Sequence, residues 1–440
     1  MRTEELAKLD RRYLWHPFTQ QQGWLAEDAP IIDRAKGTTL FDTDGREYID
    51  GVSSLWCNVH GHGHPAIDQA IRDQLDRVAH TTMLGLSHEP AILLAKRLIE
   101  IAPDGLSRVF YSDSGSTATE IAVKIAYQFW QQAGERARSR FICLKEAYHG
   151  DTIGSVSVGG IDLFHETYRP LLFETLKAEP GDAADMERLL DAHGQEVAAV
   201  IVEPLVQGAA GILTHPPGYL RAVRELCDRH GVLLICDEVA TGFGRTGTMF
   251  ACQQENVTPD LMCVAKGVSG GYLPLAATFT SERIYQSFLG AHEEFKTFFH
   301  GHTYTGNPLA CAAALASLDV FESENTMDHV AELCVALGKL LEPIAAMPRV
   351  KEVRRRGLMV GIELDGFSIA ERSGHQVTLA ARRRGAIIRP LGDVVVLMPP
   401  LAITESELSR LVGIVGESIA EVCDGVPEQE PTVERAKVTV

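Results

Sequence analysis

The middle of the chain alternates short apolar runs, typical of buried strands, with segments whose apolar residues recur every three or four positions, typical of amphipathic helices. The helical spacing is clear in Tyr219, Leu220, Val223 and Leu226. Five apolar runs predict strands, at residues 108–111, 141–144, 197–202, 232–236 and 261–265. A strand, helix, strand order predicts right-handed crossovers and an α/β fold with a largely parallel sheet covered on both faces.

The pattern changes toward both ends of the chain. Near the start, residues 38–41 and 46–49 flank Asp44-Gly45, a dipeptide that favours a tight hairpin turn. Beyond about residue 325, helical and strand patterns alternate in a way that predicts a smaller α+β domain. We therefore predict four parts: an N-terminal segment 1–60 that packs with the small domain, a large domain 61–325, a small domain 326–424 and a tail 425–440.

Composition narrows the class of protein. The 440 residues are 23% charged and 45% hydrophobic, which excludes a disordered or fibrous chain. The 41 Lys and Arg against 59 Asp and Glu give a net charge of −18, which argues against nucleic acid or an anionic membrane as a partner. The 39 glycines indicate either flexible linkers or backbone folded closely around a ligand.

No targeting or metal signal is visible. Residues 1–14 are charged throughout without the apolar core of a signal peptide, and no apolar run approaches the roughly 20 residues of a membrane-spanning helix. The nine cysteines contain no C-x-x-C pair, which favours reduced thiols over a disulfide or zinc framework. We expect a cytoplasmic protein without a metal site.

Polar or aromatic residues follow the predicted strands, at the edge where open α/β sheets bind ligands. The small polar segment 112–117 follows the first strand and leads into a helix, which suits a phosphate but is also typical of an ordinary helix cap. Tyr148 follows the second strand, where it could stack on a planar ligand or belong to the core. Glu203 follows the third strand and places a carboxylate at the same edge.

The fourth and fifth strands end in Asp237-Glu238 and Lys266. A buried acid pair needs a cation, a hydrogen-bond donor or a metal to offset its desolvation. Burial lowers the pKa of a lysine and makes its amine a usable nucleophile. Together with a phosphate site and a stacking aromatic, these residues match pyridoxal phosphate, which needs a lysine for its Schiff base and a carboxylate at its pyridine nitrogen. From the residues alone this match is suggestive.

Other interpretations are weaker. Residues 242–247 form a G-x-G-x-x-G run, a motif of NAD-dependent oxidoreductases. Neither a tightly preceding strand nor a following helix supports that interpretation. His60, His62 and His64 alternate without an adjacent Cys or acid, so structural roles are favoured over metal binding. A binding protein with a degenerate site predicts loss of Lys266 or Asp237, and both are present. The basic runs 354–356 and 382–384 are interpreted as solvated faces.

Several longer segments carry a resemblance to a known family. They lie at residues 15–19, 54–56, 113–116, 148–152, 237–247 and 388–390. Along almost its whole length the chain resembles the class III, fold-type I, pyridoxal-phosphate-dependent aminotransferases. The resemblance implies a large domain with a mostly parallel, seven-stranded sheet, a smaller α+β domain, and a homodimer with the site at its interface.

The resemblance also implies which residues hold the cofactor. They are Gly115, Ser116, Tyr148, Asp237, Lys266, His302 and Thr303. Lys266 would form the Schiff base and act as general base, and Asp237 would pair with the pyridine nitrogen. Gly115 and Ser116 would hold the phosphate, and Tyr148 would lie against the ring. His302 and Thr303 resemble a segment that reaches a phosphate across the dimer interface.

Narrower segments, Trp15-His16-Pro17, Trp56 and Arg389, resemble a branch that aminates 8-amino-7-oxononanoate in biotin biosynthesis. That resemblance implies a ping-pong exchange between a small amino donor and this keto acceptor. The implied substrate contacts are Phe18, Trp56, Tyr148, Gly301 and Arg389. A guanidinium suits the distant carboxylate of the acceptor.

The amino donor is less defined by the residues. Many members that use S-adenosylmethionine have tyrosine where this chain has Phe18, and some segments look closer to a branch that includes lysine-using enzymes. S-adenosylmethionine is favoured on family frequency, with lysine as the other donor. The broader alternative is another class III ω-amino acid aminotransferase.

Overall fold

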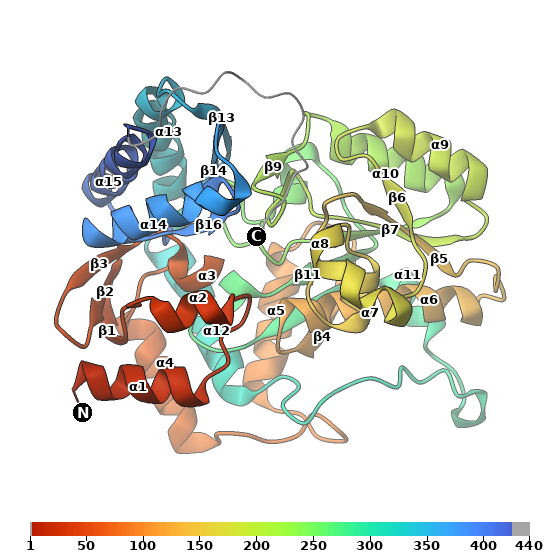
Figure 1. Cartoon of the computed structure of the whole chain (residues 1–440). Coiled ribbons are helices and arrows are strands. Elements are labelled where there is room, and N and C mark those ends of the chain that lie inside the picture. Colours follow the sequence, from red (N-terminus) through yellow and green to blue (C-terminus); the bar gives the residue numbers. More distant parts are fainter. Residues whose placement is uncertain (1, 425–440) are drawn as a thin grey trace.

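A mixed, seven-stranded sheet forms the centre of the computed structural model, which describes residues 2–424 (Figure 1). Its strand order is β4 (Leu106–Ser112), β12 (Ala276–Ser281), β11 (Leu261–Val264), β10 (Leu233–Asp237), β7 (Val197–Val202), β5 (Arg140–Leu144) and β6 (Leu176–Ala178). All neighbours pair parallel except β12, which is antiparallel to both β11 and β4. The predicted α/β class and mostly parallel sheet are confirmed.

The five strands predicted from apolar runs are present, with ends that differ by at most two residues. The short strand β6 and the antiparallel β12 were not predicted. Strand β6 has three residues and β12 is built largely from small residues, Ala-Ala-Thr-Phe-Thr-Ser, so neither gives a strong apolar run. The predicted tail, residues 425–440, lies outside the described residues.

Helices cover both faces of this sheet. Helix α6 (Gly115–Gln132) packs on one face against alternate strand residues such as Ile201 and Ile235. The intervening residues, such as Val202 and Cys236, pack on the other face in the core that includes α5 (Glu89–Ile101), α9 (Ala183–His193) and α10 (Tyr219–His230). Every residue of β7 is therefore buried, which is why its sequence is continuously apolar.

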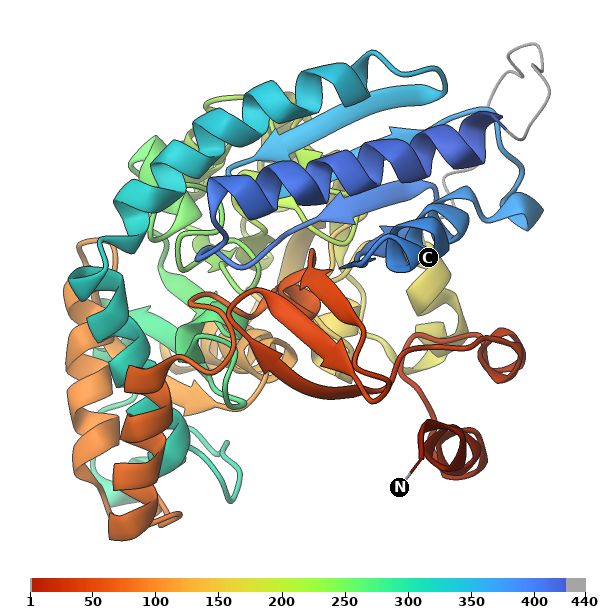
Figure 2. The ribbon, with the colours of Figure 1, turned by 90° about the vertical axis from the view of Figure 1, so that its left-hand side faces the viewer.

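The C-terminal part is built on a second sheet, with the order β13 (Val350–Arg356), β14 (Met359–Leu364), β17 (Val394–Leu397) and β16 (Arg389–Leu391). Its helices are α13 (Thr326–Ala345), α14 (Ser373–Arg383) and α15 (Glu405–Asp424). Figure 2 shows α13 and α15 side by side across these strands. The α+β character predicted for this part is present.

The N-terminal strands join the C-terminal part. Strands β1 (Ile32–Lys36), β2 (Thr39–Asp42) and β3 (Glu47–Asp50) form antiparallel pairs, and β15 (Ala386–Ile387) pairs parallel with β3. The hairpin predicted at Asp44-Gly45 is confirmed, and Asp42 Oδ1 accepts hydrogen bonds from the Asp44 and Arg46 amides across its turn. The division at residues 60, 325 and 424 stays a prediction.

The remaining elements are short or connect these layers. Within the described residues no helix is both long and apolar enough to cross a membrane. The helices are α1 (Thr3–Tyr13), α2 (Gln21–Ala26), α3 (Ser53–Trp56), α4 (Pro65–Arg77), α7 (Ile153–Ser157), α8 (Asp162–His165), α11 (Glu282–Ser287) and α12 (Pro308–Ser323). The 3-10 turns are η1 (Glu166–Leu171), η2 (Ala251–Glu255), η3 (Lys266–Ser269), η4 (His292–Glu294) and η5 (Ile369–Glu371), and β8 (Val206–Gln207) pairs with β9 (Leu213–Thr214).

A single buried arginine connects three distant segments. The Arg245 guanidinium donates to Pro399 O, just after β17, at 2.5 Å. It also donates to Ser53 Oγ and to Asn58 O, both at 3.2 Å. Ser53 Oγ in turn donates to Met398 O at 2.6 Å. Burial lowers the pKa of Arg245 to about 10, so the group stays charged at neutral pH. Its planar fork therefore holds the segment that carries Trp56 against the C-terminal part.

We expect Arg245→Leu to lower the free energy of unfolding by about 2–4 kcal/mol, because it leaves the buried Pro399 and Asn58 carbonyls without a donor. Denaturant unfolding followed by tryptophan fluorescence measures this. The matched control is the mostly exposed Arg283, which pairs with Asp260. Arg283→Leu should change stability by about 0.5 kcal/mol or less. Equal stability of the two variants would contradict the role given to Arg245.

Candidate active site

A cavity of about 650 Å³ lies at the carboxyl ends of the parallel strands of the large sheet. It brings together six of the residues predicted from the sequence. These are Trp56, Gly115, Ser116, Tyr148, Asp237 and Lys266. They come from segments more than 200 positions apart. Most of them follow strands of the sheet, and the carboxyl ends of parallel strands meet at one edge. A volume of this size is in the range of small-molecule sites.

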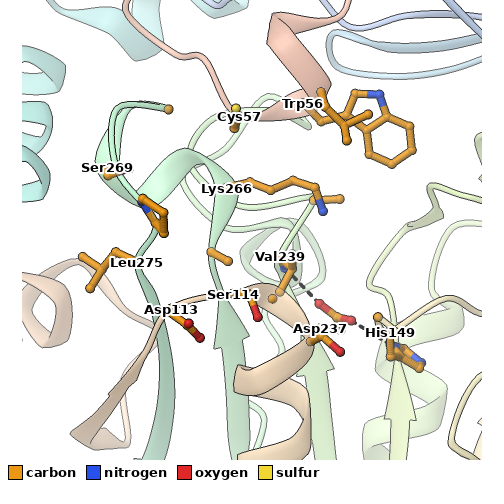
Figure 3. Close-up of a pocket in the computed structure, with 18 of the residues that line it drawn as sticks. Trp56, Cys57, Asp113, Ser114, His149, Asp237, Val239, Lys266, Ser269 and Leu275 are labelled. Carbon is orange, nitrogen blue, oxygen red and sulfur yellow. Dashed lines mark hydrogen bonds and ion pairs between the residues drawn. The ribbon is translucent and has the colours of Figure 1, made fainter. Parts of the chain in front are cut away.

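Lys266 follows β11 and projects into the cavity between Trp56 and Asp237 (Figure 3). Its Nζ lies 5.7 Å from the centroid of the Trp56 ring. Burial lowers the pKa of its ammonium group, and the nearby carboxylates of Asp237 and Glu203 oppose that shift. The backbone at Lys266 has a φ of +39°, a left-handed conformation that costs a non-glycine residue energy and is typical of functional sites.

Asp237 ends β10 and is held by two donors. Its Oδ2 lies 2.7 Å from Nδ1 of His149, and its Oδ1 accepts from the Val239 amide at 3.0 Å (Figure 3). Both the aspartate and the histidine are buried. This pairing supplies the partner that a buried carboxylate requires. His149 was not predicted as a site residue, and the only sequence signal for it was its place directly after Tyr148.

Glu203 lines the same cavity and was also not assigned a role from the sequence. Its two oxygens accept from the amides of Tyr148 at 3.1 Å and Gly208 at 2.9 Å. Burial raises the pKa of Glu203 to about 7, although His149 and the two amides oppose that shift. Glu203 therefore holds a proton more readily near neutral pH than an exposed glutamate does. Its fixed hydrogen bonds hold the backbone at Tyr148 in place.

The start of α6 offers backbone N–H groups to the cavity. Ser114 is the helix cap, and its Oγ accepts from the Thr117 amide at 3.3 Å, so the ordinary capping role considered for this segment is present. Space beside it is tight: a Cβ on Gly115 would lie 2.5 Å from Cγ1 of Val239. An 18-residue helix that opens on Gly115 and Ser116 also presents a positive dipole end, which suits a phosphate.

Together these groups fit pyridoxal phosphate. The cavity offers one amine for an aldehyde, one buried carboxylate for a protonated ring nitrogen, and one helix start for a phosphate. Trp56 and Tyr148 provide aromatic walls. The fit rests on the hydrogen-bond donors and acceptors that line the cavity. It also rests on the close contact between Gly115 and the Val239 side chain, which leaves no room for a Cβ.

Two predicted substrate residues lie beside the cavity but do not line it. The Phe18 ring centroid is 6.5 Å from that of Tyr148 and 5.5 Å from that of Phe164. Arg389, the first residue of β16, is half-buried, and burial lowers the pKa of its guanidinium while nearby Tyr148 opposes that shift. Among the described residues Arg389 has no carboxylate partner within salt-bridge distance. Its charge is therefore open to an anionic ligand.

The predicted residues Gly301, His302 and Thr303 are not brought into the cavity. They lie in the connection between α11 and α12, which projects from the body of the chain (Figure 1). His302 Nε2 comes within 3.8 Å of Asp113 Oδ1 at the cavity's edge, while Gly301 and Thr303 are exposed. A single chain therefore leaves these residues outside the site.

The structure assigns other roles to the features that raised rival interpretations. His60, His62 and His64 bond to separate partners, Ser317, Asp50 and Glu324, at 2.9–3.0 Å. Within residues 2–424 no cluster of three or more His, Cys, Asp or Glu side chains is placed to hold a metal. The run 242–247 forms a turn around the buried Phe243 and Arg245 and continues into η2, without the helix that a dinucleotide site needs.

Comparison with known proteins gives a consistent result. The family described as aminotransferase class-III matches residues 25–419. A curated adenosylmethionine-8-amino-7-oxononanoate aminotransferase of Nitratidesulfovibrio vulgaris is 57% identical, over 96% of this chain and 83% of that protein. One of the same name from Geobacter sulfurreducens is 48% identical, over 96% of this chain and 99% of that protein.

Solved structures agree with the sequence comparison. The crystal structure of the adenosylmethionine-8-amino-7-oxononanoate aminotransferase of Methanocaldococcus jannaschii has a TM-score of 0.94 and 44% identity, over 95% of this chain and 99% of that one. A PLP-bound amine transaminase from an uncultivated Pseudomonas species has a TM-score of 0.89 and 35% identity, over 93% and 99%. The chain therefore belongs to the class III aminotransferases, which are pyridoxal-phosphate-dependent enzymes.

Proposed function

We propose that this enzyme transfers an amino group to the ketone of 8-amino-7-oxononanoate, giving 7,8-diaminononanoate for biotin biosynthesis, with S-adenosylmethionine as the donor. The observation that carries the proposal is the Lys266 amine facing the buried Asp237–His149 pair within one cavity. The choice of acceptor and donor is supported by the names of relatives that are 57% and 48% identical over 96% of the chain.

Each residue around the cavity has a distinct task in this proposal. When bound, pyridoxal phosphate supplies an electron-withdrawing ring that stabilises negative charge on the substrate carbon. We assign its phosphate to the backbone at Gly115 and Ser116, and the proton on its ring nitrogen to Asp237. His149 and the Val239 amide keep the Asp237 carboxylate in position.

Lys266 is the residue that moves protons. Because burial lowers the pKa of its ammonium group, a larger share of the amine is neutral at pH 7 than in an exposed lysine. A neutral Nζ can accept a proton from the carbon that bears the amine and return it at a second position. Trp56 covers the amine on the side away from Asp237 and reduces its contact with water (Figure 3).

Arg389 supplies the cationic end for the acceptor. A half-buried guanidinium without an acidic partner among the described residues suits the distant carboxylate of an amino-oxo fatty acid. Phe18, Tyr148 and Trp56 would line the path of its apolar chain. The Phe18 ring can still stack on an adenine although it lacks a hydroxyl, so S-adenosylmethionine remains compatible with this position.

The proposal predicts a specific assay result. The holoenzyme should aminate 8-amino-7-oxononanoate with S-adenosylmethionine faster than with lysine, as measured by formation of 7,8-diaminononanoate. Lys266→Ala should lower kcat/KM by about 1,000-fold or more, because general-base catalysis is lost. The control Lys145→Ala removes an exposed lysine that pairs with Glu179 outside the cavity. Transfer from lysine alone would overturn the donor, and transfer only from a generic ω-amino acid to a different keto acid would overturn the acceptor.

Arg389→Ala should raise KM for 8-amino-7-oxononanoate by about 10- to 100-fold, the cost of a lost charge-assisted bidentate contact. The half-reaction with the donor should be little changed, because the donor has no equivalent carboxylate at that distance. Steady-state kinetics with each substrate varied in turn measure this. Arg384→Ala is the matched control, since Arg384 is also half-buried but pairs with Glu417 and Glu421. Equal acceptor kinetics in the two variants would remove the role of Arg389.

We also propose that two copies of the chain form a homodimer and complete each other's site. Exposed apolar side chains gather where two segments meet: Leu84 and Leu86 on one, Phe299 and Tyr304 on the other. His88 Nε2 and Gly306 O, 2.7 Å apart, link these segments. A second copy covering this surface could bring the partner's copy of His302 and Thr303 to the phosphate, as the family resemblance implies.

Light scattering of the holoenzyme should give twice the chain mass of 48.1 kDa. The double variant Leu84→Glu/Phe299→Glu should shift the mass toward one chain and reduce activity, since charges then have to be buried in the interface. Leu171→Glu, at another exposed apolar residue, serves as the control. A wild-type mass of 48.1 kDa would contradict the dimer.

We place the enzyme in the cytoplasm. All nine cysteines are free thiols, and seven of them are buried. Free thiols are stable in a reducing compartment, and this supports the placement.

A further inference from the structure

A second cavity, of about 440 Å³, lies away from the active site. The segment 246–248, the η2 residue Gln254, one side of α13 and the turn between β13 and β14 line it. None of its lining residues belongs to the active-site cavity. Its volume is in the range of small-molecule sites, and the proposed transamination gives it no role.

The charge of this cavity is unusual for this chain. Among the residues that the structure describes, Arg355 and Arg356 line it and no carboxylate does, although the chain as a whole carries a net charge of −18. Neither arginine makes an ion pair with a described residue. Their neighbour Arg354 differs: it is buried and pairs with Glu352 and Glu363, which corrects the interpretation of the run 354–356 as one solvated face.

The two guanidinium groups also have unused donors. Within residues 2–424, Arg356 Nε is buried without a hydrogen-bond partner, and its Nη2 makes only a long contact of 3.5 Å to His215 O. Arg355 is exposed, and among the described residues it donates only through Nη1, to Cys334 O at 2.9 Å and Gly357 O at 3.2 Å. A buried N–H without an acceptor costs free energy, and an anionic oxygen in the cavity would remove that cost.

The rest of the lining leaves room for a ligand. Gly247 has a φ of +104°, and a Cβ built on it would meet no atom within 4 Å. Gln254 Nε2 donates to Thr246 O at 2.9 Å and to Thr248 Oγ1 at 3.2 Å. These hydrogen bonds hold the two threonines that line this side of the cavity in place. We propose that this cavity binds a small organic anion whose phosphate or carboxylate group is held by Arg355 and Arg356.

The cavity shares its wall with the loop that holds Arg245. The Leu358 amide donates to Arg245 O at 3.0 Å, and a Cβ on Gly357 would lie 2.4 Å from the Thr246 carbonyl carbon. An anion held here would therefore contact the loop whose arginine donates to Ser53 and Asn58. The proposal itself concerns binding and does not depend on the substrates of the active site.

Isothermal titration of the holoenzyme with pyrophosphate and with citrate tests the proposal, at constant ionic strength. The bound cofactor keeps these probes from the phosphate position at α6. At least one probe should bind the wild type, and Arg355→Gln/Arg356→Gln should weaken it by about 10-fold or more. The control Lys339→Gln/Lys351→Gln removes two charges from the same helix and strand outside the cavity, and should bind as the wild type does. The tighter probe shows whether phosphate or carboxylate is preferred.

A second readout uses the wild type alone, in case the arginine variant does not fold. Cys334 lines the cavity, so a saturating probe should slow its alkylation by iodoacetamide at least threefold, as followed by peptide mass spectrometry. Cys57, in the active-site cavity, is the internal reference and should react at the same rate with or without the probe. The proposal is overturned if neither probe binds, if both double variants bind equally, or if Cys334 is not protected.

Discussion

The buried guanidinium of Arg245 is the contact on which the geometry of this enzyme depends. It holds residues 53–58 and the segment after β17 against its own loop through hydrogen bonds to backbone carbonyls and one hydroxyl. No carboxylate of the described residues pairs with it. Taking a charge out of water is costly, and here several buried acceptors offset that cost at once. The segment 53–58 carries Trp56, which has a φ of +68°. The three preceding residues, 53–55, also have positive φ angles. Such strain persists only where surrounding contacts fix the backbone.

Burial has opposite effects on the pKa of Glu203 and the pKa of Lys266 in the active site. It lowers the pKa of Lys266, which favours a neutral amine, and raises the pKa of Glu203 to about 7. Both oxygens of Asp237 are engaged by His149 and the Val239 amide, and both oxygens of Glu203 by two backbone amides. One cavity thus contains an amine whose pKa is lowered, a carboxyl group whose pKa is raised and a carboxylate held by two donors. Amino transfer on a protonated pyridine ring needs the amine and the carboxylate of this set.

The chain also shows that arginines on one strand can differ in purpose. Arg354 is buried between two glutamates, while Arg355 and Arg356 line a cavity that has no acid among its described residues. Arg389 on β16 is half-buried near Tyr148. Sequence position alone does not distinguish the roles of these arginines. The role of each guanidinium depends on which carboxylates the fold brings near it. In a chain with an excess of acids, an arginine left without one is an informative feature.

The sequence by itself determined the five central strands and the placement of Asp237 and Lys266 at their ends, because burial on both faces of a sheet imposes a local apolar pattern. It also indicated the family through its longer motifs. Only the tertiary structure decided that β12 runs antiparallel, that His149 pairs with Asp237 from 88 positions away, and that Arg245 reaches segments more than 150 positions distant. It also left Gly301, His302 and Thr303 outside the cavity of a single chain. The physical reason is that strand order and long-range hydrogen bonds depend on how helices and strands pack against one another. The local sequence pattern around each residue does not determine that packing.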